Sequence, residues 1–281
     1  MKILITGASG MIGNAIARIL TLDRELDVLG IGRRKNINNF SFNYLQNFDL
    51  SDPNTLEELF TSFSPNIIIN CAGITKHYEM SNIDFIKMNS LLPMFLSNLS
   101  IKYQTKLIHI STDCVFDGIK GDYLESDTTN SQDIYGRTKA LGELIDKKHL
   151  VIRTSTIGHE FGTKLGLLEW FLSQKKQCYG FKNAFFSGVT SLELANIIKN
   201  LLRNNYRGLY NVGSEKISKF ELLNIIKDTY KLNISIIPNN EYKIDRSLNS
   251  TLFNKLTKYK PKTWLHMIKE MYIDEIKNGQ R

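Results

Sequence analysis

The sequence predicts an α/β protein with a doubly wound parallel sheet and a smaller C-terminal domain interwoven with it. Three observations support this prediction. At the N-terminus an apolar run enters a glycine-spaced turn and an amphipathic run leaves it, which indicates a strand, a turn and a helix. Strand then helix recurs about six times within residues 1–155, as in a parallel sheet with helices on both faces. The remainder is less regular and shows no repeat or flexible linker.

The first unit runs from the apolar residues 3–5 through Gly7, Gly10 and Gly13 into a helix expected over 12–22. Gly7 permits a sharp turn, Gly10 lets the backbone approach a pyrophosphate, and Gly13 lets the helix pack closely on the strand. The free N–H groups at the start of the helix favour phosphate. The turn therefore indicates a dinucleotide site, with a loop that binds nothing as the alternative. Its spacing is G-x-x-G-x-x-G, not G-x-G-x-x-G.

The second expected strand, 27–32, ends in the basic run Arg33, Arg34 and Lys35, with no acidic residue beside it. In folds of this type the residue after this strand meets the adenosine ribose. A carboxylate there suits the 2′-hydroxyl of NAD, whereas paired arginines suit the 2′-phosphate of NADP. NADP(H) is therefore the expected cofactor, and NAD(H) stays open. A solvated basic loop is the alternative interpretation of the run.

Further elements follow from periodicity and from capping residues. We expect helices at 53–63, 82–103 (kinked at Pro93), 135–143, 166–174, 192–202, 219–230 and 264–277, strands at 66–70, 106–110, 151–155 and 208–212, and a loop at 183–188.

Composition narrows the class of protein. The 281 residues carry a net charge of +8, but the Lys and Arg residues are scattered, so an acidic small molecule is favoured over nucleic acid. No apolar stretch is long enough to cross a membrane, and the N-terminus lacks a signal-peptide pattern. Cys71, Cys114 and Cys178 are odd in number and widely spaced, so reduced thiols and a cytoplasmic protein are expected. The histidines show no metal-ligand spacing with them, so no metal site is expected.

Tyr135 and Lys139 are the candidate catalytic pair. They stand four residues apart on a predicted helix and so share one face. A nearby ammonium would lower the pKa of a tyrosine from its usual value near 10. Thr112, at the end of an earlier strand, can orient a carbonyl beside the phenol. The spacing of the pair occurs by chance in many helices, but together with the glycine turn and Thr112 it indicates acid–base chemistry on a carbonyl.

Four segments resemble the extended short-chain dehydrogenase/reductases, and more specifically their dTDP-4-dehydrorhamnose reductase-like branch. They are Thr6–Gly13, Asn70–Gly73, Ser111–Gly118 and Tyr135–Glu143, with a weaker fifth match at Arg246–Leu252. The resemblance covers essentially the whole chain and is most specific between residues 111 and 143. It implies an NADP-binding Rossmann domain over residues 1–158, completed by about 184–214, and a mainly substrate-binding domain over 159–281.

The resemblance also implies roles for single residues. Tyr135 would donate the proton with Lys139 as its partner, and Thr112 would hydrogen-bond the keto oxygen. The expected cofactor contacts are Gly7, Gly10, Met11, Ile12 and Gly13 at the pyrophosphate, Arg33 or Arg34 at the 2′-phosphate, Asp49 and Leu50 at the adenine, and Cys71, Ala72 and Gly73 under the nicotinamide ribose. Tyr135 and Lys139 are expected to contact the cofactor as well, since the lysine can hydrogen-bond a ribose. The expected substrate contacts are Thr112, Asp113, Lys76 and Arg246. Capping or turn formation is the alternative for Asp49, a solvated loop for Lys76 and a surface salt bridge for Arg246.

The implied activity is NADPH-dependent reduction of the 4-keto group of a nucleotide-activated 4-keto-6-deoxyhexose for surface polysaccharide. Cys114 stands where the branch usually has tyrosine, and Ser247 where it has proline, so the sugar and its nucleotide carrier stay open. The alternatives are a nucleotide-sugar epimerase or dehydratase with bound NAD, and a non-catalytic NADP-binding regulatory subunit. A homodimer is one expected oligomeric state.

Overall fold

The computed structural model describes residues 1–34, 40–160 and 163–278, and it confirms the predicted α/β class. In these ranges the central sheet has seven strands in the order β10-β6-β5-β4-β1-β2-β3, and all neighbours are parallel. They are β1 (Lys2–Thr6), β2 (Asp27–Ile31), β3 (Asn43–Leu45), β4 (Ile67–Asn70), β5 (Lys106–Thr112), β6 (Leu150–Thr154) and β10 (Gly208–Asn211). The strand order reverses between β1 and β4, where folds of this kind bind ligands.

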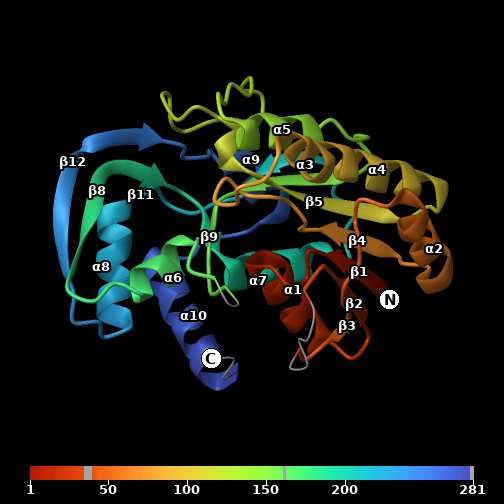
Figure 1. Ribbon diagram of the computed structural model, residues 1–281, viewed down its shortest axis with the longest axis horizontal. Coiled ribbons are helices and arrows are strands. Elements are labelled where there is room, and N and C mark those ends of the chain that lie inside the picture. The colour runs from red at the N-terminus through yellow and green to blue at the C-terminus, as the bar shows by residue number, and fades with distance from the viewer. Residues whose placement is uncertain (35–39, 161–162, 279–281) are drawn as a thin grey trace.

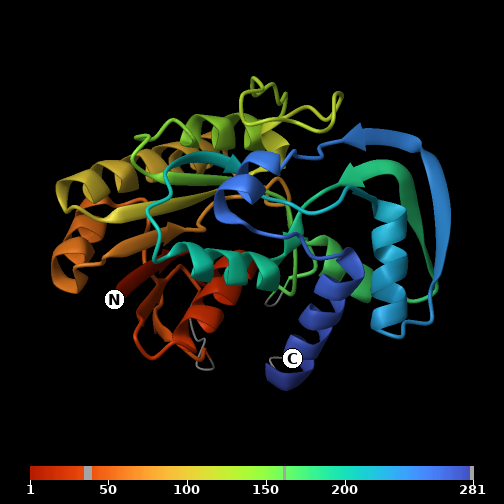
Figure 2. The same cartoon turned by 180° about the vertical axis from the view of Figure 1, so that it is seen from behind.

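Helices cover both faces of this sheet (Figures 1 and 2). One face carries α2 (Pro53–Phe63), α3 (Asn82–Ile86), α4 (Leu92–Lys102) and α5 (Ile134–Gly142), and the other carries α1 (Met11–Thr21) and α7 (Ser191–Leu201). Alternate strand residues point to opposite faces. Ile3 and Ile5 belong to the core on the α1 side, whereas Leu4 belongs to the core on the α2 side. The sheet is therefore doubly wound, as the sequence predicts.

A second lobe lies beyond the carboxyl ends of the strands, at the left of Figure 1. In the described ranges it is built on a three-stranded sheet in the order β11-β8-β12, while the short pair β7–β9 and the helix α10 lie toward the large sheet and α9 packs against β10 of that sheet. The elements are β7 (Thr156–Ile157), α6 (Leu167–Leu172), β8 (Gln177–Phe186), β9 (Val189–Thr190), β11 (Ile217–Ser218), α8 (Lys219–Thr229), β12 (Ser235–Asp245), α9 (Thr251–Thr257) and α10 (Trp264–Asn278).

The two lobes share one hydrophobic core. Ile3 of β1, Ile152 of β6, Leu222 of α8 and Met267 of α10 all belong to the same buried cluster. Strand β10, which lies within the segment 184–214, pairs with β6 and so closes the edge of the large sheet. The chain therefore returns to the first lobe after it has entered the second, while a domain boundary at residue 158 stays a prediction.

The helix predicted over 82–103 is divided, and its irregular turn lies before Pro93. A π-helical turn, η1 (Lys87–Leu91), separates α3 from α4. Pro93 has no N–H to donate to the Asn89 carbonyl four residues earlier, so regular helical bonding is interrupted there.

The loop predicted at 183–188 is wrong for its first part. Asn183–Phe186 is the end of β8, whose residues 183–185 pair with 243–245 of β12. Pairing between segments distant in the sequence overrides the local preference of Asn and Ser for turns.

Candidate active site

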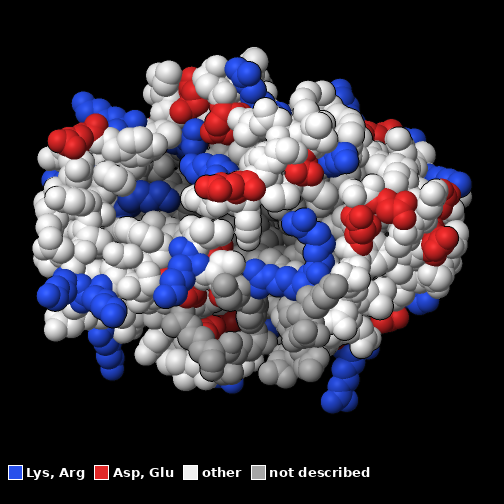
Figure 3. Space-filling model, in the orientation of Figure 1, with Lys and Arg blue, Asp and Glu red and all other residues white. Residues whose placement is uncertain are grey.

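A groove of about 180 Å³ crosses the carboxyl ends of β1, β2 and β4. Lys and Arg side chains border the hollows on this face of the molecule (Figure 3). The groove brings together predicted cofactor contacts from four separate segments, namely Gly7, Gly10, Arg33, Arg34, Leu50, Cys71, Ala72 and Gly73. Asp49 does not line it, and Met11 and Ile12 line the adjoining cleft described below.

The glycine turn leaves no room for larger residues. Gly7 has φ +67°, and a Cβ there would lie 2.8 Å from the backbone of Ala72. A Cβ on Gly13 would lie 2.4 Å from the carbonyl oxygen of Gly7. Helix α1 follows Gly10, which offers no capping side chain, and its first turn has no acidic residue. The turn and its free N–H groups therefore fit the pyrophosphate of a dinucleotide.

The end of the groove after β2 is basic. Arg33 is exposed and Arg34 is partly buried, and Tyr44 Oη donates a hydrogen bond of 3.3 Å to the Arg34 carbonyl. Of the described residues that line the groove, none is acidic. Lys35, the last member of the predicted basic run, lies outside the described residues. This chemistry fits a ribose 2′-phosphate better than a free 2′-hydroxyl.

Asp49 forms a turn. Its Oδ1 accepts hydrogen bonds from the backbone N–H of Ser51 at 2.9 Å and from the Ser51 hydroxyl at 2.8 Å. These bonds hold the pKa of the Asp49 carboxyl below its ordinary value. The turn that the sequence left as the alternative is therefore present, and a contact of Asp49 with adenine stays a prediction.

Buried Asn89 fixes the loop that carries Cys71, Ala72 and Gly73. Its Oδ1 accepts from the backbone N–H of Ile74 at 2.8 Å, and its Nδ2 donates to the Ile74 carbonyl at 2.9 Å. This pair of hydrogen bonds joins the loop to the π-helical turn. Burial raises the pKa of the Cys71 thiol to about 12, so it is un-ionised beside the groove.

Beside the groove lies a cleft of about 670 Å³ that holds the candidate catalytic residues. Thr112, at the end of β5, and Tyr135, in the first turn of α5, both line this cleft, and the Thr112 hydroxyl donates to the Asp113 carboxylate at 3.2 Å. Lys139 lies beneath the floor of the site, where its Nζ donates to the Ile110 carbonyl at 2.8 Å. A Cβ on Gly73 would lie 4.0 Å from this Nζ, so the ammonium reaches the edge of the cofactor groove.

The pKa values differ from the expectation for a tyrosine beside an ammonium. Burial raises the pKa of Tyr135, and the nearby Cys114 raises it further, so the expected lowering is wrong for the protein alone. The Tyr135 phenol is consequently protonated at neutral pH, which is the form that a proton donor needs. Burial lowers the pKa of Lys139 to about 8, while the charge of Glu143 opposes that shift.

Glu143 belongs to a buried polar network behind α5. It binds Arg153 of β6 through two hydrogen bonds, from Nε at 2.9 Å and from Nη2 at 2.7 Å, and it accepts a third from the Ser111 hydroxyl at 2.5 Å. Both members of the ion pair have side chains that are 5% exposed. The pair therefore connects α5, which carries Tyr135, to the ends of β5 and β6.

Arg246 is largely buried, and its Nη2 lies 4.0 Å from the carboxylate of the exposed Asp133, so an ion pair of the kind left as the alternative is present. The Arg246 side chain is 15% exposed, its Nε donates to the Phe116 carbonyl at 2.9 Å, and its Nη1 lies 3.5 Å from Cys114 Sγ. Arg246 therefore joins the segment after β12 to the loop after β5. A role for it at a diphosphate stays a prediction.

A third cavity of about 380 Å³ adjoins the cleft in the second lobe. Its walls are largely aromatic and come from α6, β8 and β12: Trp170, Tyr179, Phe181, Phe185, Phe186 and Tyr242. Lys219, at the start of α8, also lines it. Sequence reasoning missed these residues, although the alternation of Tyr179 and Phe181 is a period-two signal typical of a strand.

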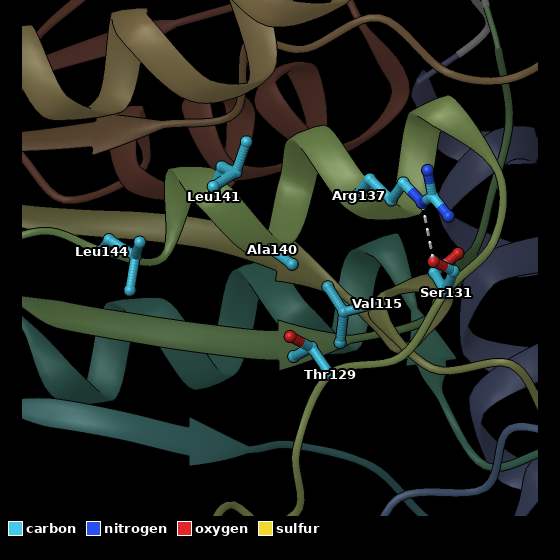
Figure 4. A pocket seen from close by; sticks show the side chains of 7 residues that line it. All are labelled: Val115, Thr129, Ser131, Arg137, Ala140, Leu141 and Leu144. Atoms are coloured by element: carbon cyan, nitrogen blue, oxygen red, sulfur yellow. Dashed lines mark hydrogen bonds between the residues drawn. The ribbon is translucent and has the colours of Figure 1, made fainter.

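Another pocket lies on the opposite face of α5 (Figure 4). It is lined by Val115, Thr129, Ser131, Arg137, Ala140, Leu141 and Leu144, and Arg137 Nε donates to the Ser131 carbonyl. None of the predicted site residues lines it.

Elsewhere, the described ranges contain no cluster of three potential metal ligands from His, Cys, Asp and Glu. Within the same ranges, no helix has the length and apolar character required to cross a bilayer.

Comparisons with known proteins show which family the chain resembles along its length. The family model described as the RmlD substrate binding domain matches residues 1–277. The dTDP-4-dehydrorhamnose reductase of Aggregatibacter actinomycetemcomitans is 31% identical over 57% of this chain, and the match spans 53% of that relative, about half its length. The spore coat polysaccharide biosynthesis protein SpsK of Bacillus subtilis is 26% identical over 98% of this chain and 97% of its own.

A solved structure supports the fold. The dTDP-4-dehydrorhamnose reductase of Bacillus anthracis, determined in complex with NADP, has a TM-score of 0.83 and 21% identity over 97% of this chain and 99% of that one. The match of the family model along nearly the whole sequence confirms the resemblance expected from the motifs: the chain belongs to the RmlD substrate binding domain family.

Proposed function

We propose that this protein is an NADPH-dependent reductase of the 4-keto group of a nucleotide-activated 4-keto-6-deoxyhexose. The observation that carries the proposal is the placement of Thr112 and Tyr135 together in a cleft that lies beside the glycine groove. The names of the relatives support the substrate class. The NADP complex of a structural neighbour and the basic end of the groove support the cofactor.

Each candidate residue has a distinct task in this reaction. NADPH, when bound, supplies the hydride that C4 of the sugar receives. Thr112 donates a hydrogen bond to the keto oxygen, and Tyr135 gives that oxygen its proton, so the carbonyl becomes a hydroxyl. The phenolate left on Tyr135 is favoured by the nearby charge of Lys139. Asn89 holds the loop that shapes the cofactor side of the cleft.

Turnover tests the proposal directly. NADPH oxidation is measured with dTDP-, UDP- and GDP-linked 4-keto-6-deoxyhexoses, and at least one of them should be reduced. If none of these sugars supports the oxidation of NADPH, the proposal is contradicted. Failure with dTDP sugars together with success on UDP or GDP sugars assigns the carrier.

A matched pair of variants tests the chemical role of the phenol. Tyr135→Phe should lower kcat by about 10²–10⁴-fold with unchanged affinity for NADPH, because only the proton donor is lost. Tyr206→Phe removes a hydroxyl from the loop before β10 and should leave kcat unchanged. If the cellular role of the protein survives Tyr135→Phe, the regulatory-subunit alternative replaces ours. If the purified protein retains tightly bound NAD, the epimerase or dehydratase alternative does.

The setting of the reaction also belongs to the proposal. The similarity to SpsK supports a product used in surface polysaccharide. Free thiols at Cys71, Cys114 and Cys178 support action in the reducing cytoplasm. Formation of a homodimer stays a prediction.

A further inference from the structure

The reaction cleft and the aromatic cavity share a boundary, and two lysines stand on it. Lys76, from the loop after β4, and Lys219, the first residue of α8, line both spaces. Asp113, beside the candidate catalytic Thr112, is also common to both. A ligand that extends from one space into the other must pass these charged groups.

The backbone holds Lys219 firmly in this place. Ser218 caps α8 and accepts from the N–H of Glu221, whose carboxylate in turn accepts from the N–H of Ser218. The preceding strand β11 pairs with Phe185 and Phe186 of β8. The Nζ of Lys219 consequently lies 4.4 Å from the ring centroid of Phe186, at the entrance to the aromatic cavity.

Among the described residues, the ammonium of Lys219 has no hydrogen-bonded or ion-paired partner, and the Phe186 ring is its recorded contact. Burial lowers the pKa of Lys219, and Lys76 lowers it further, whereas Asp113 opposes the shift. A partly buried cation without a hydrogen-bonded carboxylate is costly for a folded protein, and an anionic ligand bound at this boundary would offset that cost.

The sugar, diphosphate and base of a nucleotide sugar follow one another in the same order as the catalytic cleft, its boundary and the aromatic cavity. With the sugar beside Thr112 and Tyr135, and the base among the aromatic rings of β8 and β12, the diphosphate lies at the boundary between the two. We propose that Lys219, together with Lys76, binds the diphosphate of the nucleotide-sugar substrate. This inference rests on the proposed function, and it makes the aromatic cavity the site of the nucleobase.

This assignment gives the contact with the diphosphate to Lys219 and not to Arg246. The guanidinium of Arg246 is already bonded to the Phe116 carbonyl and lies against Cys114. Lys219 instead offers three donor hydrogens that have no acceptor among the described residues. The charge that contacts the diphosphate therefore comes chiefly from the start of α8, a position that the resemblance had not implied.

Calorimetric titration of the full-length protein tests the proposal without turnover. The probes are dTDP and UDP, and their nucleosides thymidine and uridine. Lys219→Met should weaken the binding of the better diphosphate by about 10- to 100-fold, since it removes a charged hydrogen bond, and should leave nucleoside affinity within about twofold. Lys219→Arg should recover most of the loss.

Lys216→Met is the matched control. Lys216 lies over the ring of Phe185, next to Phe186, but it is paired with Asp245 and lines neither space. The Lys216→Met variant should bind the diphosphate with the same affinity as the wild type. Unchanged affinity for NADPH in Lys219→Met shows that the fold and the cofactor groove are intact.

Two outcomes overturn the proposal: equal diphosphate affinity in Lys219→Met and the wild type, or a loss shared equally by nucleosides, diphosphates and NADPH. Failure of the proposed function is recognised separately. If dTDP or UDP binds in a Lys219-dependent manner but no keto sugar is reduced, the diphosphate site stands and the reductase assignment falls.

Discussion

Lys139 should set the alkaline limit of activity. Burial lowers its pKa from 10.5 to about 8, a shift that corresponds to about 3 kcal/mol between the charged and neutral forms. The ammonium then predominates about tenfold at pH 7 and is outnumbered about tenfold at pH 9. Only the ammonium favours the phenolate that forms on Tyr135. We therefore expect kcat/KM for NADPH, which reports groups of the free enzyme, to fall about tenfold per pH unit above pH 8.

The measurement is a pH–rate profile from pH 6.5 to 10 for the wild type and for Lys139→Arg. A guanidinium stays charged throughout this range, so the variant should lose the alkaline limb even if its activity is lower overall. Persistence of the same limb in Lys139→Arg would show that another group titrates there. Absence of the limb from the wild type would refute the reasoning about burial.

The same shift has a consequence for stability. The folded-state pKa of Lys139 lies below its unfolded value, so the buried ammonium costs stability below pH 8, and this cost disappears as the pH rises from 8 to 10.5. Lys139→Met removes the cost of about 3 kcal/mol, but it leaves the Ile110 carbonyl without its donor, which costs about 1–3 kcal/mol. Urea unfolding at pH 7 should find this inactive variant at least as stable as the wild type. A clear loss of stability in this variant would contradict the argument.

Three further variants test other parts of the site. Gly13→Ala should abolish NADPH binding, measured by fluorescence titration, because the new Cβ would lie 2.4 Å from the Gly7 carbonyl oxygen. Arg33→Ser should weaken NADPH by about 10- to 100-fold and leave NADH unaffected; an equal loss for both would rule out a contact with the 2′-phosphate. Glu143→Gln should lower the free energy of unfolding by about 3–5 kcal/mol in urea, since it breaks the buried pair with Arg153, and a change below about 1 kcal/mol would count against that role.

The sequence predicted the helices and turns on the cofactor side of the molecule well because their signals are local. The glycine turn, the Asp52–Pro53 start of α2 and the spacing of Tyr135 and Lys139 each lie within one strand–turn–helix unit or one helix. Such patterns fix which residues share a face and where a helix begins, whatever the rest of the chain does.

The substrate side depends on contacts between distant segments, which explains the errors there. Asn183–Phe186 has the composition of a loop, and it becomes a strand because β12 pairs with it. Lys219 follows an ordinary capping residue, and its position matters only because β11 places it beside Phe186. The pKa of Tyr135 was predicted in the wrong direction because burial, which a motif does not report, is the largest effect on it.

The position of β10 has a consequence for biosynthesis. The chain leaves the ribosome from its N-terminus, and β6 is complete at Thr154, whereas its partner β10 begins only at Gly208. Until α7 and β10 have emerged, the edge of β6 is unpaired and the face of α1 that packs on α7 is exposed. Stable closure of the large sheet must therefore wait until most of the second lobe has been synthesised, so a nascent chain stalled before residue 208 is a natural client for chaperones.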